Sequence, residues 1–238
     1  MVQGLKERDF ISNTFGRYVD QEIARELIRQ PEATRLGGEI REVAILMSNI
    51  RGFTQLSESL NPESIVSILN RYFSHMIKVI KNYQGIIVDF FGDGVLVFFD
   101  PLEGPVAPTI ERALRCAMEI QNKMQGLNAE MRKEGLPELE MGIGLNAGQV
   151  VVGNIGSETR AKYGIVGSAV NLTQHIQEVA GGGEVVISDS IYHYASRYLD
   201  MRKSFEIQLK GLQEKIKLHV PDSKRIHPFS QETADGGH

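Results

Sequence analysis

The sequence has few of the features that mark secreted, membrane-spanning or metal-cluster proteins. Its one cysteine, Cys116, excludes an intrachain disulfide framework and a metal site built from several cysteines. No apolar run approaches the roughly 18 residues that a membrane-spanning helix needs, and the N-terminus carries no signal-peptide pattern. The sequence therefore favours a cytosolic chain, although the cytosolic domain of a membrane-bound or sensor protein would have the same composition.

An excess of charge of one sign is also missing. The chain has 26 basic and 30 acidic residues, which gives a formal net charge of −4. Without a basic surplus, nothing indicates a nucleic-acid partner. The 238 residues include 42% hydrophobic residues, which is enough for one large domain with appendages.

Hydrophobic periodicity and turn residues predict alternating strands and helices through most of the chain. In order, we predict a strand at 42–49, a helix at 62–82, a hairpin at 86–99, a helix at 106–133, a hairpin at 139–156 that turns near Ala147-Gly148, a helix at 168–179, a strand at 184–188, a short helix at 189–196, and strands near 204–210 and 214–219. This βαββαβ order with additions predicts an α/β (α+β) fold. We expect a ferredoxin-like core with a mixed, mainly antiparallel sheet and flanking helices.

The two ends of the chain differ from this pattern. Residues 1–39 carry apolar positions at near-helical spacing, which fits a helical cap on the domain or the end of a linker from an upstream module. Residues 221–238 are polar and contain proline and glycine, which predicts a disordered tail. One domain is therefore expected at 40–220.

Three short stretches carry candidate chemistry. MSNIRGFT (47–54) follows an apolar strand and suits a turn that holds a metal and a phosphate. FFGDG (90–94) places Asp93 in a tight turn between strands, and YGIVGSAVNLTQHI (163–176) runs from a glycine turn into a helix. Asn171 and His175 lie four residues apart in that helix and share a face. Taken singly, the last two have plain structural explanations, a turn aspartate and a buried polar pair.

In this order and spacing, the stretches resemble the class III nucleotide cyclase catalytic domain, the adenylyl/guanylyl cyclase homology domain. The resemblance covers about 40–220 and includes GIGLNAGQVVVGNIGS (142–157) and Leu-Lys-Gly (209–211). Residues 15–28 resemble the segment that often precedes the domain in bacterial members, which implies an upstream sensor or membrane module. The resemblance implies a homodimer with shared active sites and two Mg²⁺ or Mn²⁺ ions. It also implies that a nucleoside triphosphate becomes a 3′,5′-cyclic nucleotide and pyrophosphate in intracellular signalling.

The resemblance further implies a role for each matching position. The positions are Asn49, Ile50 and Asp93 for the metal ions, Phe53, Thr54 and Lys210 for the phosphates, Asp89 and Gly164 for the base, and Asn171 and His175 for the ribose and the transition state. Asp93 and position 49 of one chain would serve one site. Asp89, Lys210 and the two helix residues would serve the site that the partner chain completes.

Four of these positions depart from the family pattern. Asn49 replaces a metal-binding aspartate with a neutral amide that has one acceptor oxygen, so one ion rather than two is expected. His175 replaces an arginine, and histidine is mostly neutral near pH 7 unless its neighbours raise its pKa. Asp89 and Gly164 replace the usual base-reading residues, which leaves the base open, with ATP slightly ahead of GTP.

Two hypotheses follow from these departures. The first is a nucleotide cyclase, a phosphorus–oxygen lyase, whose activity is weak or abolished in this chain by Asn49 and impaired also by His175. This hypothesis is favoured if Asn49 is an engineered replacement of an aspartate, and the sequence leaves that open. The alternative is a catalytically degenerate cyclase-homology domain that binds nucleotide or serves as a dimerising signalling module. A ferredoxin-like domain of other chemistry is disfavoured by the Val-Asn-Leu segment (170–172) and by Leu-Lys-Gly (209–211).

Overall fold

The structure is a computed structural model that describes residues 36–101, 104–208 and 215–226. The helical pattern predicted within 1–35, the Leu-Lys-Gly segment with Lys210, and most of the predicted tail lie outside the described residues. The described elements are β1 (Gly37–Ile50), α3 (Phe53–Ser59), α4 (Pro62–Asn82), β2 (Ile86–Phe91), β3 (Gly94–Phe99), α5 (Ala107–Lys133), β4 (Met141–Ser157), β5 (Arg160–Val166), α6 (Ser168–Val179), β6 (Val185–Ser188), α7 (Asp189–Ala195), β7 (Leu199–Gln208) and β8 (Lys215–Ile226).

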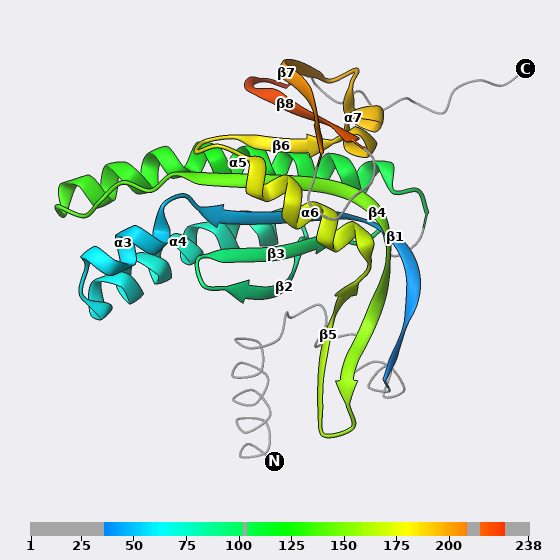
Figure 1. Cartoon of the computed structure of the whole chain (residues 1–238), viewed down its shortest axis with the longest axis horizontal. Coiled ribbons are helices and arrows are strands. Elements are labelled where there is room, and N and C mark those ends of the chain that lie inside the picture. The colour runs from blue at the N-terminus through cyan, green and yellow to red at the C-terminus, as the bar shows by residue number, and fades with distance from the viewer. Residues whose placement is uncertain (1–35, 102–103, 209–214, 227–238) are drawn as a thin grey trace, which may run out of the picture.

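Eight strands form one sheet in the order β2-β3-β1-β4-β6-β8-β7, and β5 pairs with β4 beside this path. Strands β4 and β6 are parallel, and the other described pairs are antiparallel. This arrangement confirms the predicted mixed, mainly antiparallel sheet with flanking helices. Figure 1 shows α5 and α6 on opposite sides of the central strands β1 and β4.

The central strand β1 is buried on both faces, which explains its nearly continuous apolar run. Ala44 and Leu46 join the core beneath α4, α5 and α7. Val43 and Ile45 point to the other face and join a second core that includes Ala169 of α6. The sheet is therefore the middle of three layers.

Helix α4 begins and ends where local signals predict. The Asn61 side chain accepts a hydrogen bond from the Ser64 N–H at 2.8 Å, and Pro62 occupies the first turn. The apolar stripe buries Ile68 and Tyr72 against the core. The predicted helix at 62–82 is confirmed, as is the helix at 168–179.

The predicted hairpin at 139–156 is wrong. Residues Met141–Ser157 form one long strand, β4, and the chain turns between Ser157 and Arg160 into β5. Gly148 lies within β4, where a Cβ would come 3.0 Å from the Ala169 Cβ of α6. The glycine therefore permits close packing of a helix and marks no turn. Strands β4 and β5 form an arm that projects from the body (Figure 1).

The last two strands are longer than predicted. Strand β7 starts at Leu199, and β8 runs to Ile226, past the expected start of the tail at 221. The two strands pair with each other along this length through irregular register. No described helix is long and apolar enough to cross a membrane.

Candidate active site

The structure brings the MSNIRGFT turn and the Gly-Asp-Gly turn into contact. The Ile50 N–H at the end of β1 donates a hydrogen bond to Asp93 Oδ2 at 2.9 Å. Gly94 allows this approach, because a Cβ there would come 2.9 Å from the Ser48 carbonyl oxygen. Three predicted metal positions, Asn49, Ile50 and Asp93, therefore lie together although 43 residues separate the last two.

The Asp93 carboxyl group is partly buried between these turns. Burial raises its pKa above the ordinary value, while hydrogen bonds from its own N–H and from Ile50, and the Arg51 guanidinium, oppose this shift. Since burial penalises the ionised form, a cation placed beside the carboxylate would relieve that penalty. The Arg51 guanidinium already supplies part of this relief, so a bound cation would add to it.

The donor set fits a hard divalent cation that substrate oxygens help to hold. Asp93 offers carboxylate oxygens, Asn49 an amide oxygen and Ile50 a main-chain carbonyl, and Mg²⁺ and Mn²⁺ prefer such oxygen ligands. Within the described ranges, no group of three or more His, Cys, Asp and Glu side chains is placed to hold a metal. Asp93 is the one carboxylate among the three predicted metal positions, so phosphate oxygens would complete the oxygen ligands of an ion there.

Helix α3, which sequence reasoning did not predict, begins directly after this turn. Gly52 precedes it in the left-handed conformation, with φ of 68°, and the Leu56 N–H donates to the Gly52 carbonyl oxygen at 3.0 Å. Phe53 and Thr54 are the first two helical residues, so their N–H groups have no partner within the helix. Both predicted phosphate amides thus lie next to the Asn49–Asp93 cluster.

Arg51 is a site residue that sequence reasoning missed. Its N–H donates to the Glu140 carbonyl oxygen at 2.7 Å, and its Nη2 donates to the Gln177 carbonyl oxygen at 2.5 Å. The side chain passes over Gly142, where a Cβ would come 2.7 Å from the guanidinium carbon. Burial lowers the Arg51 pKa, and the nearby Asp93 and Glu178 oppose that shift. The glycines at alternate positions of GIGLN (142–146) are the sequence feature that could have indicated a side chain lying across β4.

The two predicted base-reading positions lie on β2 and β5, which do not pair in the sheet but approach each other through side chains. Lys162 Nζ donates to Asp89 Oδ2 at 2.5 Å, and the Phe90 N–H donates to Asp89 Oδ1 at 2.9 Å. Gly164 is two residues along β5 from Lys162 and shares its face. A Cβ at Gly164 would come 3.1 Å from Val88 Cγ1 of β2. The structure therefore joins Asp89 and Gly164 and adds Lys162, which sequence reasoning did not identify.

Helix α6 presents Asn171 and His175 outward. Asn171 is exposed, and the His175 side chain is about one-third exposed, at 32%. The explanation that they form a buried polar pair is therefore wrong. His175 Nδ1 lies 3.2 Å from Glu178 Oε2, and Gln174 Nε2 donates to Glu178 Oε1 at 3.2 Å. No side-chain hydrogen bond or ion pair in the described part of the chain joins Asn171 or His175 to the Asn49–Asp93 cluster.

Comparison with known proteins identifies this arrangement. Residues 38–221 match the family model described as the adenylate and guanylate cyclase catalytic domain. The chain belongs to this family. The cyclase domain resembles the solved guanylyl cyclase Cya2, with 41% identity, a TM-score of 0.74, and coverage of 78% of this chain and 94% of that one. It also resembles the adenylyl cyclase CyaB from P. aeruginosa, with 30% identity, a TM-score of 0.75, and coverage of 85% and 100%.

The curated relatives of the cyclase domain are longer proteins. It is 32% identical over 225 residues to the uncharacterized protein Rv1318c of Mycobacterium tuberculosis, a match that covers 93% of this chain and 40% of that protein. A similar match to the uncharacterized protein Mb1354c of Mycobacterium bovis has 33% identity and covers 100% and 41%. The chain thus spans about two-fifths of the length of these relatives.

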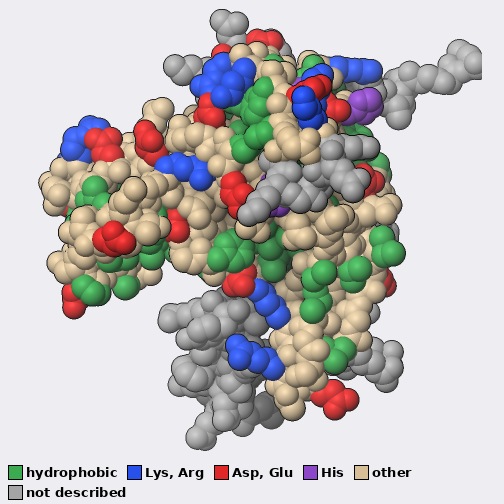
Figure 2. Space-filling model, in the orientation of Figure 1, with side chains coloured by type: hydrophobic (Ala, Val, Ile, Leu, Met, Phe, Trp, Pro, Cys, Tyr) green, Lys and Arg blue, Asp and Glu red, His purple; other side chains and the backbone are tan. Residues whose placement is uncertain are grey.

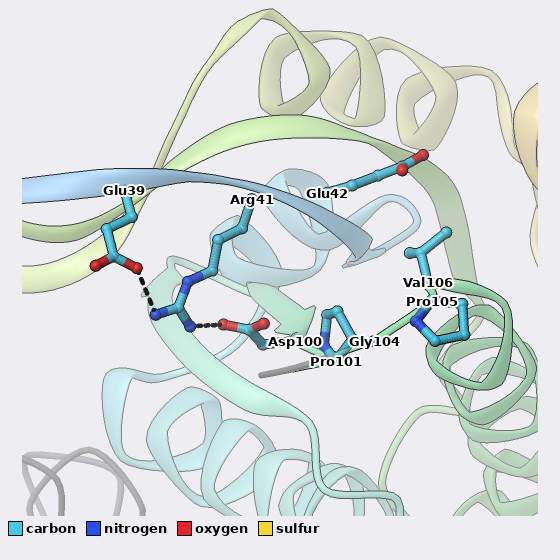
Figure 3. A pocket seen from close by; sticks show the side chains of 8 residues that line it. All are labelled: Glu39, Arg41, Glu42, Asp100, Pro101, Gly104, Pro105 and Val106. Carbon is cyan, nitrogen blue, oxygen red and sulfur yellow. Dashed lines mark hydrogen bonds and ion pairs between the residues drawn. The ribbon is translucent and has the colours of Figure 1, made fainter.

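A polar cavity of about 400 Å³ lies away from the predicted site residues (Figure 3). Arg41 crosses it, donating to Asp100 Oδ2 at 2.7 Å and to Glu39 Oε2 at 2.9 Å. Glu42, Pro101, Gly104, Pro105 and Val106 line the rest. None of the site residues predicted from the sequence lines this cavity, so it is separate from the cyclase site.

Proposed function

We propose that this domain, in the native protein, converts a nucleoside triphosphate to a 3′,5′-cyclic nucleotide and pyrophosphate. The observation that carries the proposal is the 2.9 Å contact between the Ile50 N–H and Asp93, which joins two turns beside the start of α3. Carboxylate, carbonyl and amide groups converge there. In-line phosphoryl chemistry needs such positioning and charge neutralisation more than it needs covalent help.

Each group of residues has a distinct task in this proposal. A bound Mg²⁺ or Mn²⁺ would neutralise the triphosphate and lower the pKa of the ribose 3′-hydroxyl. Asp93, Ile50 and Asn49 hold that ion, and the Phe53 and Thr54 amides receive phosphate oxygens. Asn171 orients the ribose and His175 faces the phosphates. Lys210, outside the described residues, remains a predicted phosphate contact.

We further propose that the active sites are shared between two copies of the chain. In the described part of one chain, no side-chain hydrogen bond or ion pair joins the metal positions to Asn171 or His175, and we propose that a second copy brings them together. An apolar row across the arm supplies a surface for pairing. Ile40 of β1, Val151 of β4 and Val166 of β5 lie in register and are 74%, 38% and 54% exposed. A strictly monomeric mass in light scattering at high concentration would argue against shared sites.

The base preference rests on the Asp89–Lys162 pair. By itself, Asp89 offers only hydrogen-bond acceptors, so adenine N1, which is also an acceptor, would lack a donor. The Lys162 ammonium supplies that donor. The pair therefore suits adenine, through N1 and the N6 amine, and keeps ATP as the favoured substrate by a small margin. Guanine also presents an acceptor and donors to such a pair, so GTP has to be tested beside ATP.

The alternative is a nucleotide-binding or dimerising module without turnover. One specific observation favours it. Arg51 places a positive charge beside Asp93, and Asn49 adds no negative charge, so the cluster is nearly neutral where two ions would have to bind. Figure 2 shows acidic and basic side chains interspersed on the visible face, without an extended patch of one sign, and hydrophobic side chains near the arm.

The decisive experiment restores the missing carboxylate. The Asn49→Asp variant is assayed with ATP, GTP, CTP and UTP, each with Mg²⁺ and with Mn²⁺, and the products are separated by chromatography. Asn70→Asp, an exposed position on α4, is the control for the added charge. We expect product from Asn49→Asp well above that of the parent chain and the control. Absence of product from every nucleotide would overturn the catalytic proposal.

Calorimetry with the parent chain separates the two functions. Micromolar binding of ATP or GTP without turnover would support the binding module, and turnover by the Asn49 chain itself would refute it.

Because the matched relatives are more than twice as long as this chain, we also propose that an upstream sensor or membrane module precedes the domain. The domain would then work in the cytosol, where nucleoside triphosphates are present.

A further inference from the structure

We propose that Arg51 is a positioning residue that ties the metal turn to helix α6, so that a cation at Asp93 tightens the C-terminal end of α6. The inference rests on the proposed function, because it needs a cation and a triphosphate at the Asn49–Asp93 cluster. It adds a link between the two groups of residues that the proposed dimer assigns to different sites.

Two hydrogen bonds fix Arg51 between the turn and the helix. Its main-chain N–H holds the turn to β4 through the Glu140 carbonyl oxygen at 2.7 Å. Its Nη2 reaches the Gln177 carbonyl oxygen, 126 residues away, at 2.5 Å. The Ala180 N–H, which caps α6, donates to the same carbonyl. A guanidinium at this end also complements the negative end of the helix dipole.

Two glycines of β4 make the path that the side chain follows. Gly142 and Gly144 lie two residues apart and therefore share one face of the strand. A Cβ at Gly142 would come 2.7 Å from both Cζ and Nε of Arg51, and a Cβ at Gly144 would come 2.7 Å from the Gln177 Cα. The absence of both Cβ atoms lets the guanidinium and the last turn of α6 lie directly on the sheet.

The charges around Arg51 explain how the link responds to a cation. Asp93 lies on the side of the metal turn and Glu178 on the side of the helix, and both attract the guanidinium. Its Nε is buried without a hydrogen-bond partner, so the group is held by few contacts. A divalent cation at Asp93 would cancel the attraction on the turn side. The guanidinium would then interact more strongly with the Gln177 carbonyl and with Glu178.

The consequence reaches the face of α6 that carries the site residues. Asn171 and His175 lie on this helix, and Glu178, one residue after Gln177, contacts His175 at 3.2 Å. In a dimer with shared sites, α6 of one chain serves the site whose metal the partner holds. Metal occupancy in one site would therefore be felt at the other site through Arg51.

Hydrogen exchange measured by mass spectrometry tests this link. The peptide that covers 168–180 is followed in the parent chain, with and without Mn²⁺ and adenosine 5′-(α,β-methylene)triphosphate. We expect exchange at the end of α6 to slow by about two- to fivefold on binding, as suits one helix-end charge contact. Arg51→Met should remove most of this slowing. If Arg51→Met does not fold, Arg51→Lys serves instead. Lysine keeps the positive charge but lacks the forked guanidinium, so the slowing of exchange should be smaller than in the parent.

Arg112→Met is the matched control. Arg112 also donates Nη2 to a main-chain carbonyl, that of Asp100 at 3.3 Å, and also has a buried Nε without a partner. Arg112→Met should leave the slowing of hydrogen exchange in α6 unchanged. A full response in the Arg51 variants, or an equal loss in Arg112→Met, would overturn the inference. Calorimetry separates the two failures. If neither the parent chain nor Asn49→Asp binds the analogue with Mn²⁺, the proposed function is refuted, whereas binding without slowed exchange refutes only the role of Arg51.

Discussion

The contact between Arg51 and Gly142 allows a stability prediction with three matched glycine substitutions. In Gly142→Ala the new methyl group would come 2.7 Å from Cζ and Nε of Arg51, so the guanidinium has to leave its place over β4. The displaced side chain would lose its hydrogen bond to the Gln177 carbonyl oxygen. The substitution therefore tests how much this one contact stabilises the fold.

The magnitude follows from what each new methyl group meets. A hydrogen bond to a charged group contributes about 1.5–3 kcal/mol, and the released guanidinium regains some hydration, so we expect Gly142→Ala to cost about 1–3 kcal/mol. Gly144→Ala should cost more, because its methyl group would meet the Gln177 backbone, which cannot swing away as a side chain can. Gly126→Ala in α5 meets nothing within 4 Å and should stabilise by about 0.5–1 kcal/mol.

Urea unfolding followed by circular dichroism gives the three free energies of unfolding. A double-mutant cycle adds the decisive measurement, because Gly142→Ala should cost less than about 0.5 kcal/mol once Arg51→Ala has removed the guanidinium. The predicted order is Gly144→Ala, Gly142→Ala, parent, Gly126→Ala, from least to most stable. An equal cost of Gly142→Ala with and without the Arg51 side chain would refute this account of the glycine.

Three further predictions address the pKa of Asp93, the base and a helix cap. Burial raises the Asp93 pKa, so the metal-free protein loses stability as pH rises from about 3.8, the ordinary value, through the higher value of the folded state. Asp93→Asn should therefore be more stable than the parent at pH 7 and equally stable at pH values below about 3.8. Urea titrations across this pH range give the free energies of unfolding. Lys162→Ala leaves Asp89 with acceptors alone and should move the ratio of ATP to GTP affinity about tenfold towards GTP by calorimetry, and an unchanged ratio would remove Lys162 from base recognition. Asn61→Ala deletes the cap on the Ser64 N–H and should lower the free energy of unfolding by about 1 kcal/mol, whereas Asn61→Ser should retain most of it.

Local signals in the sequence predict most of the fold. Asn61 with Pro62 marks the start of α4, and the apolar stripe of that helix carries it to Asn82. Such signals depend on residues within a few positions of each other. The glycines of 142–148 show where this reasoning fails. Glycine at a turn and glycine beneath a packed helix look alike in sequence, so the pattern predicts a hairpin where the structure has one long strand.

The sequence by itself determined the family, and it supplied the candidate groups for the site and the departures at Asn49 and His175, because these depend on residue types at fixed spacing. Only the tertiary structure decided which groups meet. Lys162 reaches Asp89 across 73 residues, and Arg51 reaches the Gln177 carbonyl across 126. Those contacts depend on the order of strands in the sheet and on the face that α6 covers. A spacing pattern cannot specify them, since each is closed by packing between elements that are distant in the chain.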